Sequence, residues 1–224
     1  MLEERITNIK RNLIEYAGLV ENMIDKALQG LLERELQPLN EVMEKDEVRS
    51  NKFELEIDEM CLATIAQFQP KARDLRTILM ALRINNDLER IADHAVNIAE
   101  SSAFLIERPV LKPLIDIPRM SQISVRMLKD SINAFINEDV ELAYDVCMRD
   151  SGVDNLRDQI LRELIMFMSS SPTTIERAFQ LIRISSNLER IADLSTNISE
   201  DIIFMVQGKV IKHYAEEGSD RIKE

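Results

Sequence analysis

The fold is decided by a stretch that occurs twice, first as Arg83-Ile84-Asn85-Asn86-Asp87-Leu88-Glu89-Arg90-Ile91-Ala92-Asp93 and then, one hundred residues later, as Arg183-Ile184-Ser185-Ser186-Asn187-Leu188-Glu189-Arg190-Ile191-Ala192-Asp193. Eleven of the eighteen positions from 83 to 100 are identical to those from 183 to 200. The match extends upstream, where residues 42–46 (VMEKD) correspond to residues 146–150 (VCMRD). Self-similarity at a fixed period is typical of repeated structural units, so the chain is an internal tandem duplication.

The composition favours long helices. The 224 residues include only five glycines, and 45% of them are apolar while 30% are charged. So few turn-forming residues indicate a handful of long helices rather than many strands. Proline marks the boundaries: Pro38 follows the first helix, Pro70 fits the first turn of the third, and three prolines between 109 and 118 mark a linker between the halves.

We therefore predict an all-α fold of two tandem, pseudo-symmetric three-helix bundles with six long antiparallel helices. The first bundle covers residues 1–108, the Pro-rich linker 109–118, the second bundle 119–210, and a loose charged tail 211–224. The expected helices are 3–36, one ending near 69, 71–106, one ending near 137, 138–169, and one that begins at Ser171-Pro172 and ends near 207, with Gly208 as its cap. The predicted buried seam of the third helix is Ile84, Leu88, Ile91, Ala95 and Ile98.

Charge and motifs argue against several classes of protein. With 28 basic and 40 acidic residues, the net charge of −12 disfavours direct nucleic-acid binding. We find no Gly-rich phosphate loop, no HExxH and no nucleophile beside a base, so we do not expect an enzyme. His94 is expected to be an ordinary exposed helical histidine, because its duplicate is Leu194. Cys61 and Cys147 fit buried small hydrophobes in a reducing, cytoplasmic compartment, and no apolar run is long enough to span a membrane.

The acidic residues of the duplicated stretch form the candidate site. Glu89 and Asp93 lie four residues apart and so share one helix face, and the second copy repeats the pair. Acidic residues also interrupt apolar stripes on the second helix of each half, where a carboxylate needs a partner. If the second and third helices of each half are neighbours, the acidic residues converge in two groups: Asp46, Glu89 and Asp93 in the first half, and Asp150, Asp154, Glu189 and Asp193 in the second.

Oxygen donors with little histidine or cysteine nearby suit a metal site, for which iron, zinc, manganese or magnesium are candidates. A solvated acidic face with ordinary ion pairs to Arg90 or Arg190 is an equally open interpretation of the residues alone. A second apolar stripe, consisting of Ile78, Leu79 and Leu82 with Ala178, Phe179 and Ile182, leaves a surface that a partner can cover. The stripe leaves the oligomeric state open, and a homodimer is the assembly we expect.

The run from Leu88 to Glu100, its second copy, and the run from Gln69 to Arg76 resemble the PhoU family of phosphate-uptake regulators. The similarity extends from about residue 5 to residue 210. The resemblance implies two tandem three-helix bundles and metal ligands at the seven acidic positions named above, in some members as multinuclear iron or zinc clusters. The family often has a second acidic residue four positions after the aspartate of the second helix. In the second half Asp154 is this residue, but the first half has Ser50 at the equivalent position. We therefore expect the metal site of the first half to have fewer ligands than that of the second.

The resemblance also implies a function. It predicts a negative regulator that acts on the ATPase or permease of a phosphate ABC transporter and on a phosphate-sensing histidine kinase, peripheral to the membrane through these partners only. Two other functions stay open: a helical scaffold or dimerisation module that binds no metal, and a metal buffer.

Overall fold

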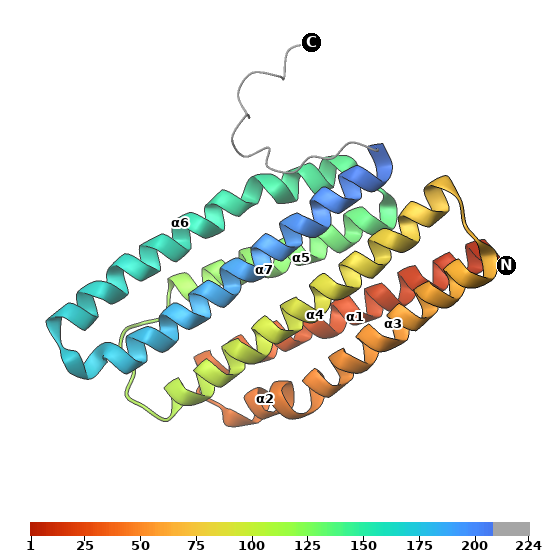
Figure 1. Cartoon of the computed structure of the whole chain (residues 1–224). Helices are drawn as coiled ribbons and strands as arrows, with labels where there is room; N and C mark the ends of the chain where they lie inside the picture. The colour runs from red at the N-terminus through yellow and green to blue at the C-terminus, as the bar shows by residue number, and fades with distance from the viewer. Residues whose placement is uncertain (208–224) are drawn as a thin grey trace, which may run out of the picture.

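The computed structural model describes residues 1–207 and confirms an all-α fold of two three-helix bundles (Figure 1). The first bundle is built from α1, α3 and α4, and the second from α5, α6 and α7. The described elements are α1 (Leu2–Glu33), α2 (Leu36–Glu41), the π-helical turn η1 (Val42–Asp46), α3 (Glu47–Phe68), α4 (Ala72–Ile106), α5 (Asp116–Asn137), α6 (Val140–Ser170), the 3₁₀ turn η2 (Pro172–Thr174) and α7 (Ile175–Gln207). The predicted cap Gly208 and the tail 211–224 lie outside the described residues.

The predicted seam of α4 forms the core of the first bundle. Ile84, Leu88, Ile91, Ala95 and Ile98 are all completely buried. Their spacing of three and four residues places them on one side of the helix, where α1 packs against them. In α7, Ile184, Leu188, Ile191 and Ile198 are likewise completely buried, so each half buries the same stripe.

The second helix of the first half departs from the prediction. Pro38 marks the boundary after the first helix, as predicted, but α1 already stops at Glu33 and Pro38 lies in the first turn of the short helix α2. Proline is tolerated there because the backbone N–H groups of a first turn have no partner within the helix. Gly30 makes this corner possible, since a Cβ at that position would lie 2.5 Å from Leu39 Cδ2. Leu39 is buried, so α2 closes the end of the bundle.

The two halves turn their corners in the same way. Arg34 caps α1 and Glu138 caps α5, and both have left-handed backbone conformations, with φ of 57° and 56°. Other prolines differ from the prediction: Pro70 precedes α4 rather than entering its first turn, and Pro118 lies inside α5, which begins at Asp116. Ser171 and Pro172 begin the 3₁₀ turn η2, and α7 starts after it, at Ile175.

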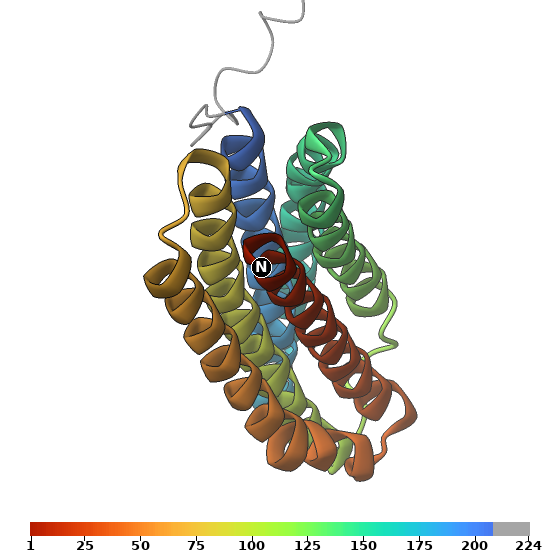
Figure 2. The ribbon, with the colours of Figure 1, turned by 90° about the vertical axis from the view of Figure 1, so that its right-hand side faces the viewer.

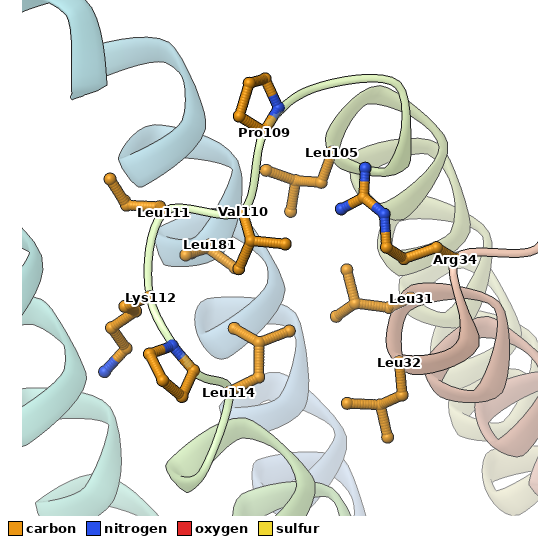
Figure 3. A pocket seen from close by; sticks show the side chains of 11 residues that line it. Leu31, Leu32, Arg34, Leu105, Pro109, Val110, Leu111, Lys112, Leu114 and Leu181 are labelled. Carbon is orange, nitrogen blue, oxygen red and sulfur yellow. The ribbon is translucent and has the colours of Figure 1, made fainter.

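The linker lines a cavity of about 210 Å³ at one end of the molecule (Figure 3). Leucines from α1, α4 and α7, among them Leu31, Leu105 and Leu181, surround it together with residues 109–114. Arg34 holds the linker in place by donating hydrogen bonds to the carbonyl oxygens of Ile106 and Arg108.

The two bundles join along α4 and α7, which run antiparallel (Figures 1 and 2). Arg83 pairs with Asp201, and Arg183 pairs reciprocally with Glu100 at 3.7 Å. Between these pairs, His94 Nδ1 and Asn187 Oδ1 lie 2.8 Å apart. The expectation of an ordinary exposed histidine is therefore wrong: His94 is half-buried between the two halves, and its burial lowers its pKa.

The second apolar stripe is only partly available to a partner. Ile78 and Ala178 are completely buried, whereas Leu79 and Phe179 are exposed. The expected surface on α4 and α7 is thus narrower than the sequence indicates. Both cysteines are free, and burial raises the pKa of each thiol to about 12, so both stay protonated at neutral pH. No helix within residues 1–207 has the length and apolar character needed to span a bilayer.

Candidate functional site

The second half places the four predicted carboxylates on two adjacent helices, near enough for their charges to act on one another. Asp150 and Asp154 lie one turn apart on α6, and Glu189 and Asp193 lie one turn apart on α7. The two helices pack side by side, because Val146, Val153 and Leu188 are completely buried on their facing sides. Asp150 follows Val146 by four residues, which keeps its carboxylate close to the helix contact rather than in open solvent.

The four carboxylates act on one another electrostatically. Burial raises the pKa of Asp150, and the charges of Asp154 and Glu189 raise it further. Burial also raises the pKa of Asp193, with Asp150 as the next largest cause, and the pKa of Glu189, with Asp193 as the next. Each rise means that the protein makes the negative form less favourable than water does. Burial is the largest cause of each rise, and the neighbouring carboxylates add to it.

One oxygen in this group has no partner. Within residues 1–207, Asp150 Oδ1 is buried and lacks a hydrogen-bond donor, and so does the neighbouring Thr196 hydroxyl. The Thr196 hydroxyl faces the Asp150 carboxyl and lowers its pKa as a hydrogen-bonding group does, but the two do not meet in a hydrogen bond of normal geometry. A buried polar atom without a partner is costly, and native sites that retain one often bind a water molecule or an ion there.

Two arginines lie at the edge of the group without neutralising it closely. Arg157 approaches Glu189 at 3.8 Å, and Arg190 approaches Glu189 at 3.8 Å and Asp193 at 3.6 Å. These separations exceed hydrogen-bond lengths, and the Arg190 side chain is 64% exposed. Such contacts contribute little to stability and leave the carboxylate oxygens available to another cation.

The first half gathers a different set of acidic residues. Burial raises the pKa of Glu89, followed by the charges of Asp93 and Glu54. Glu54, on α3, thus takes the place next to Glu89 that the sequence prediction gave to Asp46. Ser50, the residue in place of a second acid, is buried and lies 2.7 Å from the Tyr16 hydroxyl. The two neutral hydroxyl groups satisfy each other.

Asp46 finds its partner on α1 instead. Its carboxylate is 3% exposed and accepts a hydrogen bond of 2.8 Å from Lys26 Nζ, while Arg49 approaches it at 3.2 Å. Burial disfavours the charged form of Lys26, but hydrogen bonds from Lys26 to Asp46 and Glu41 outweigh it, so the pKa of Lys26 lies above its usual value. The sequence prediction that a buried carboxylate here needs a partner is confirmed, and the partner is an ammonium group.

The two halves differ in their fit to a metal ion. Within residues 1–207, no three Asp, Glu, His or Cys side chains are grouped so that they could hold a metal ion. The second half nevertheless offers the chemistry of a hard-cation site, with four carboxylates, an unpartnered buried oxygen and mutual repulsion that a cation would relieve. The first half fits less well, because Asp46 is already neutralised and Ser50 adds no charge.

Three contributors were missed by sequence reasoning. Glu54 lies four residues after Ser50, so helical spacing from Asp46 through Ser50 pointed to it. Arg157 lies three residues after Asp154 and was available from the same reasoning. Lys26 carried no such signal, because it belongs to another helix.

Comparison with known proteins agrees with the fold and with the duplication. The PhoU domain family model matches the chain twice, at residues 13–102 and 117–202. A phosphate-specific transport system accessory protein PhoU homolog from Aquifex aeolicus is 38% identical over 212 residues, covering 95% of this chain and 96% of that protein. Homolog 2 from Thermotoga maritima is 35% identical over 217 residues, covering 97% and 92%.

Solved structures are similar over almost the whole chain. The crystal structure of PhoU from Pseudomonas aeruginosa superposes with a TM-score of 0.89 at 30% identity, covering 93% of this chain and 100% of that one. A phosphate transport system regulatory protein PhoU from Streptococcus pneumoniae has a TM-score of 0.85 at 23% identity and shares the fold. The repeated acidic helix, the paired bundles and these matches lead to one conclusion: the chain is a member of the PhoU family.

Proposed function

We propose that this protein is a regulatory accessory protein of phosphate uptake that binds metal ions through the acidic group of its second half. The observation that carries the metal proposal is the buried, unpartnered Asp150 Oδ1 among Asp154, Glu189 and Asp193. Family membership supports the regulatory part, since relatives of this chain are named accessory proteins of phosphate-specific transport.

Asp150, Asp154, Glu189 and Asp193 would hold the ions. When bound, a divalent or trivalent cation supplies positive charge to which phosphate or the oxygen atoms of a partner can coordinate. Iron and zinc are favoured as ions, singly or as multinuclear clusters, with manganese and magnesium as further candidates. The residues of the chain itself provide a rigid acidic surface on two packed helices.

The proposed partners are the ATPase or permease of a phosphate ABC transporter and a phosphate-sensing histidine kinase, approached from the cytoplasm. The protein would keep the phosphate-starvation response off when phosphate is plentiful. A second copy of the chain completes the set of proposed partners.

Metal content tests the proposal directly. Protein purified without chelator is analysed by elemental mass spectrometry, and apo protein is titrated with Zn²⁺, Mn²⁺ and Fe²⁺. We expect bound metal in the unmodified chain and loss of most of it in the double variant Asp150→Asn with Asp193→Asn. The matched control is Asp158→Asn, also on α6, whose side chain is 52% exposed. A chain that takes up no cation, or a double variant that retains its metal, contradicts the proposal.

The competing functions give different results in the same experiment. A helical scaffold with solvated acidic faces binds no metal, while a metal buffer binds many more ions per chain than four carboxylates can hold. Partner binding is tested separately, with Glu89, Asp93, Glu189 and Asp193 all changed to Ala. If the kinase and transporter subunits bind this variant as well as the unmodified chain, the metal is not the bridge to them.

A further inference from the structure

The outer face of α3 carries an apolar stripe that no other part of the described chain covers. Val48, Leu55 and Leu62 are 64%, 63% and 61% exposed. They lie seven residues apart, so they follow one line along the helix for two heptads. Large apolar side chains at this spacing and this exposure are the pattern of a helix that packs against a partner helix.

The position of α3 leaves this face free. Within residues 1–207, α3 packs on α1, α4 and η1 and on no other element. Figures 1 and 2 show α3 along one outer edge of the molecule. The duplicate helix α6 does not repeat the stripe in full: the corresponding positions are Gly152, Gln159 and Met166, of which only Met166 is a large, exposed apolar residue. The stripe is therefore not a by-product of the repeat.

Exposed charges of both signs lie beside the stripe. Lys52 precedes Leu55 and pairs within α3 with Glu56 at 3.4 Å, and Glu59 follows Leu55; all three side chains are exposed. At 100° per residue, Lys52 and Glu59 lie on the same side of the stripe, at nearly equal distances before and after Leu55. A second α3 that runs antiparallel, related by a two-fold axis at Leu55, would place each Lys52 opposite the other copy's Glu59. Two parallel copies would place Lys52 and Glu59 of one copy on the opposite side of the interface from those of the other, so these pairs could not form.

We propose that two copies of this chain form a homodimer through α3, packed antiparallel with Leu55 on the two-fold axis. Val48 of each copy then packs against Leu62 of the other, and two Lys52–Glu59 pairs flank the apolar line. Such an isologous contact is the usual form of a closed dimer. The inference rests on the homodimer in the proposed function and names its surface, but it depends on neither the metal site nor the transport partners.

Sedimentation equilibrium of the full chain tests the surface. We expect the unmodified chain to be a dimer at micromolar concentration and Leu55→Asp to weaken the dimer by more than about a hundredfold, because two apolar contacts are lost and two charges are buried. The matched control is Gln159→Asp at the equivalent outward position of α6, which should leave the dimer unchanged. Helical content measured by circular dichroism should be the same in both variants.

Charge reversal tests the antiparallel register. We expect Lys52→Glu to weaken the dimer about tenfold and the combined variant Lys52→Glu with Glu59→Lys to return within about threefold of the original, because the exchanged pairs match again. Cysteine cross-linking provides a second measurement. Under mild oxidation Leu55→Cys should cross-link to itself and Leu62→Cys should not, with the unmodified chain as the background for Cys61 and Cys147.

The outcomes separate the proposals. A monomeric unmodified chain overturns the homodimer altogether. A dimer that survives Leu55→Asp retains the homodimer but overturns the α3 interface, and a combined charge variant that stays as weak as Lys52→Glu overturns the antiparallel register. Metal content is measured on the same samples, so a failure of the metal proposal is seen independently.

Discussion

Asp87 is a single residue whose environment conflicts with its charge. It lies on α4 at the seam with α7, and burial raises the pKa of its carboxyl from the ordinary 3.8 to about 6 despite the opposing charge of Arg90. A raised pKa means that the folded state binds the proton more tightly than the unfolded state. The carboxylate therefore costs stability above pH 6, and the cost fades as the pH falls toward 4.

Asp87→Asn should remove this cost. We expect the variant to be more stable than the unmodified chain by about 1–2 kcal/mol at pH 7.5, a value that allows for partial solvation of the carboxylate. At pH 4 the two proteins should be equally stable. Urea unfolding followed by circular dichroism at the two pH values measures the difference. The control is Asp158→Asn, whose side chain is 52% exposed, so the substitution should change the free energy of unfolding little at either pH. A variant that is less stable at pH 7.5 would show that the Arg90–Asp87 pair outweighs burial.

Among the elements, the segment from α2 through η1 to α3 shows how one irregular turn redirects a side chain. A π-helical turn holds an extra residue relative to an α-helical one, so it changes the direction of the side chains that leave it. Asp46 ends this turn and faces Lys26 of α1. In α6, which is α-helical throughout, the duplicate Asp150 stays with the acidic group at α7.

Lys26→Met tests the importance of this ion pair. We expect a loss of about 2–3 kcal/mol of unfolding free energy, because Asp46 stays buried with only the exposed Arg49 nearby. Adding Asp46→Asn should recover most of the loss, since no charge then remains unpaired. Urea denaturation at pH 7 measures both variants, and a loss as large in the double variant as in the single one would contradict the pairing.

The same comparison shows what the sequence can and cannot predict. The buried seam of α4 was predictable because apolar residues recur every three or four positions. The placement of the four acids of the second half was predictable because they lie on two regular, adjacent helices. The partner of Asp46 was not predictable, because it depends on the local winding of η1, which the spacing of side chains in the sequence does not reveal. Pro38 marked the boundary between α1 and α2, but its place inside α2 was not predictable, because a proline fits the first turn of a helix as readily as a linker.

At the scale of the whole molecule, α4 and α7 make the two bundles one structure. Their contacts are reciprocal at the ends, where Arg83 reaches Asp201 and Arg183 reaches Glu100, but not at the middle. His94 faces Asn187 there. Their counterparts in the repeat are Leu194 and Asp87, and the antiparallel register of the two helices places this second pair close together as well. The pseudo-symmetry thus breaks at the centre of the seam, which is where the two copies of the repeat touch.

Because α4 and α7 pack on each other and both bury apolar side chains, we expect the two bundles to unfold together rather than one at a time. Hydrogen exchange with mass spectrometry at increasing urea should give α1, α4, α5 and α7 peptides the same midpoint. Apolar burial should dominate this coupling, because the polar contacts at the seam are partly solvated.

Variants at His94 and Asn187 separate the two contributions. In a double-mutant cycle of His94→Ala and Asn187→Ala, the coupling energy should be about 0.5–1.5 kcal/mol, the usual net value of one hydrogen bond, and the common midpoint should persist. Leu188→Ala in the core of α7 should cost about 2–5 kcal/mol and lower the midpoints of both bundles. If that variant unfolds the second bundle while α1 and α3 keep their protection, the two repeats are independent domains and the seam between them is only a contact.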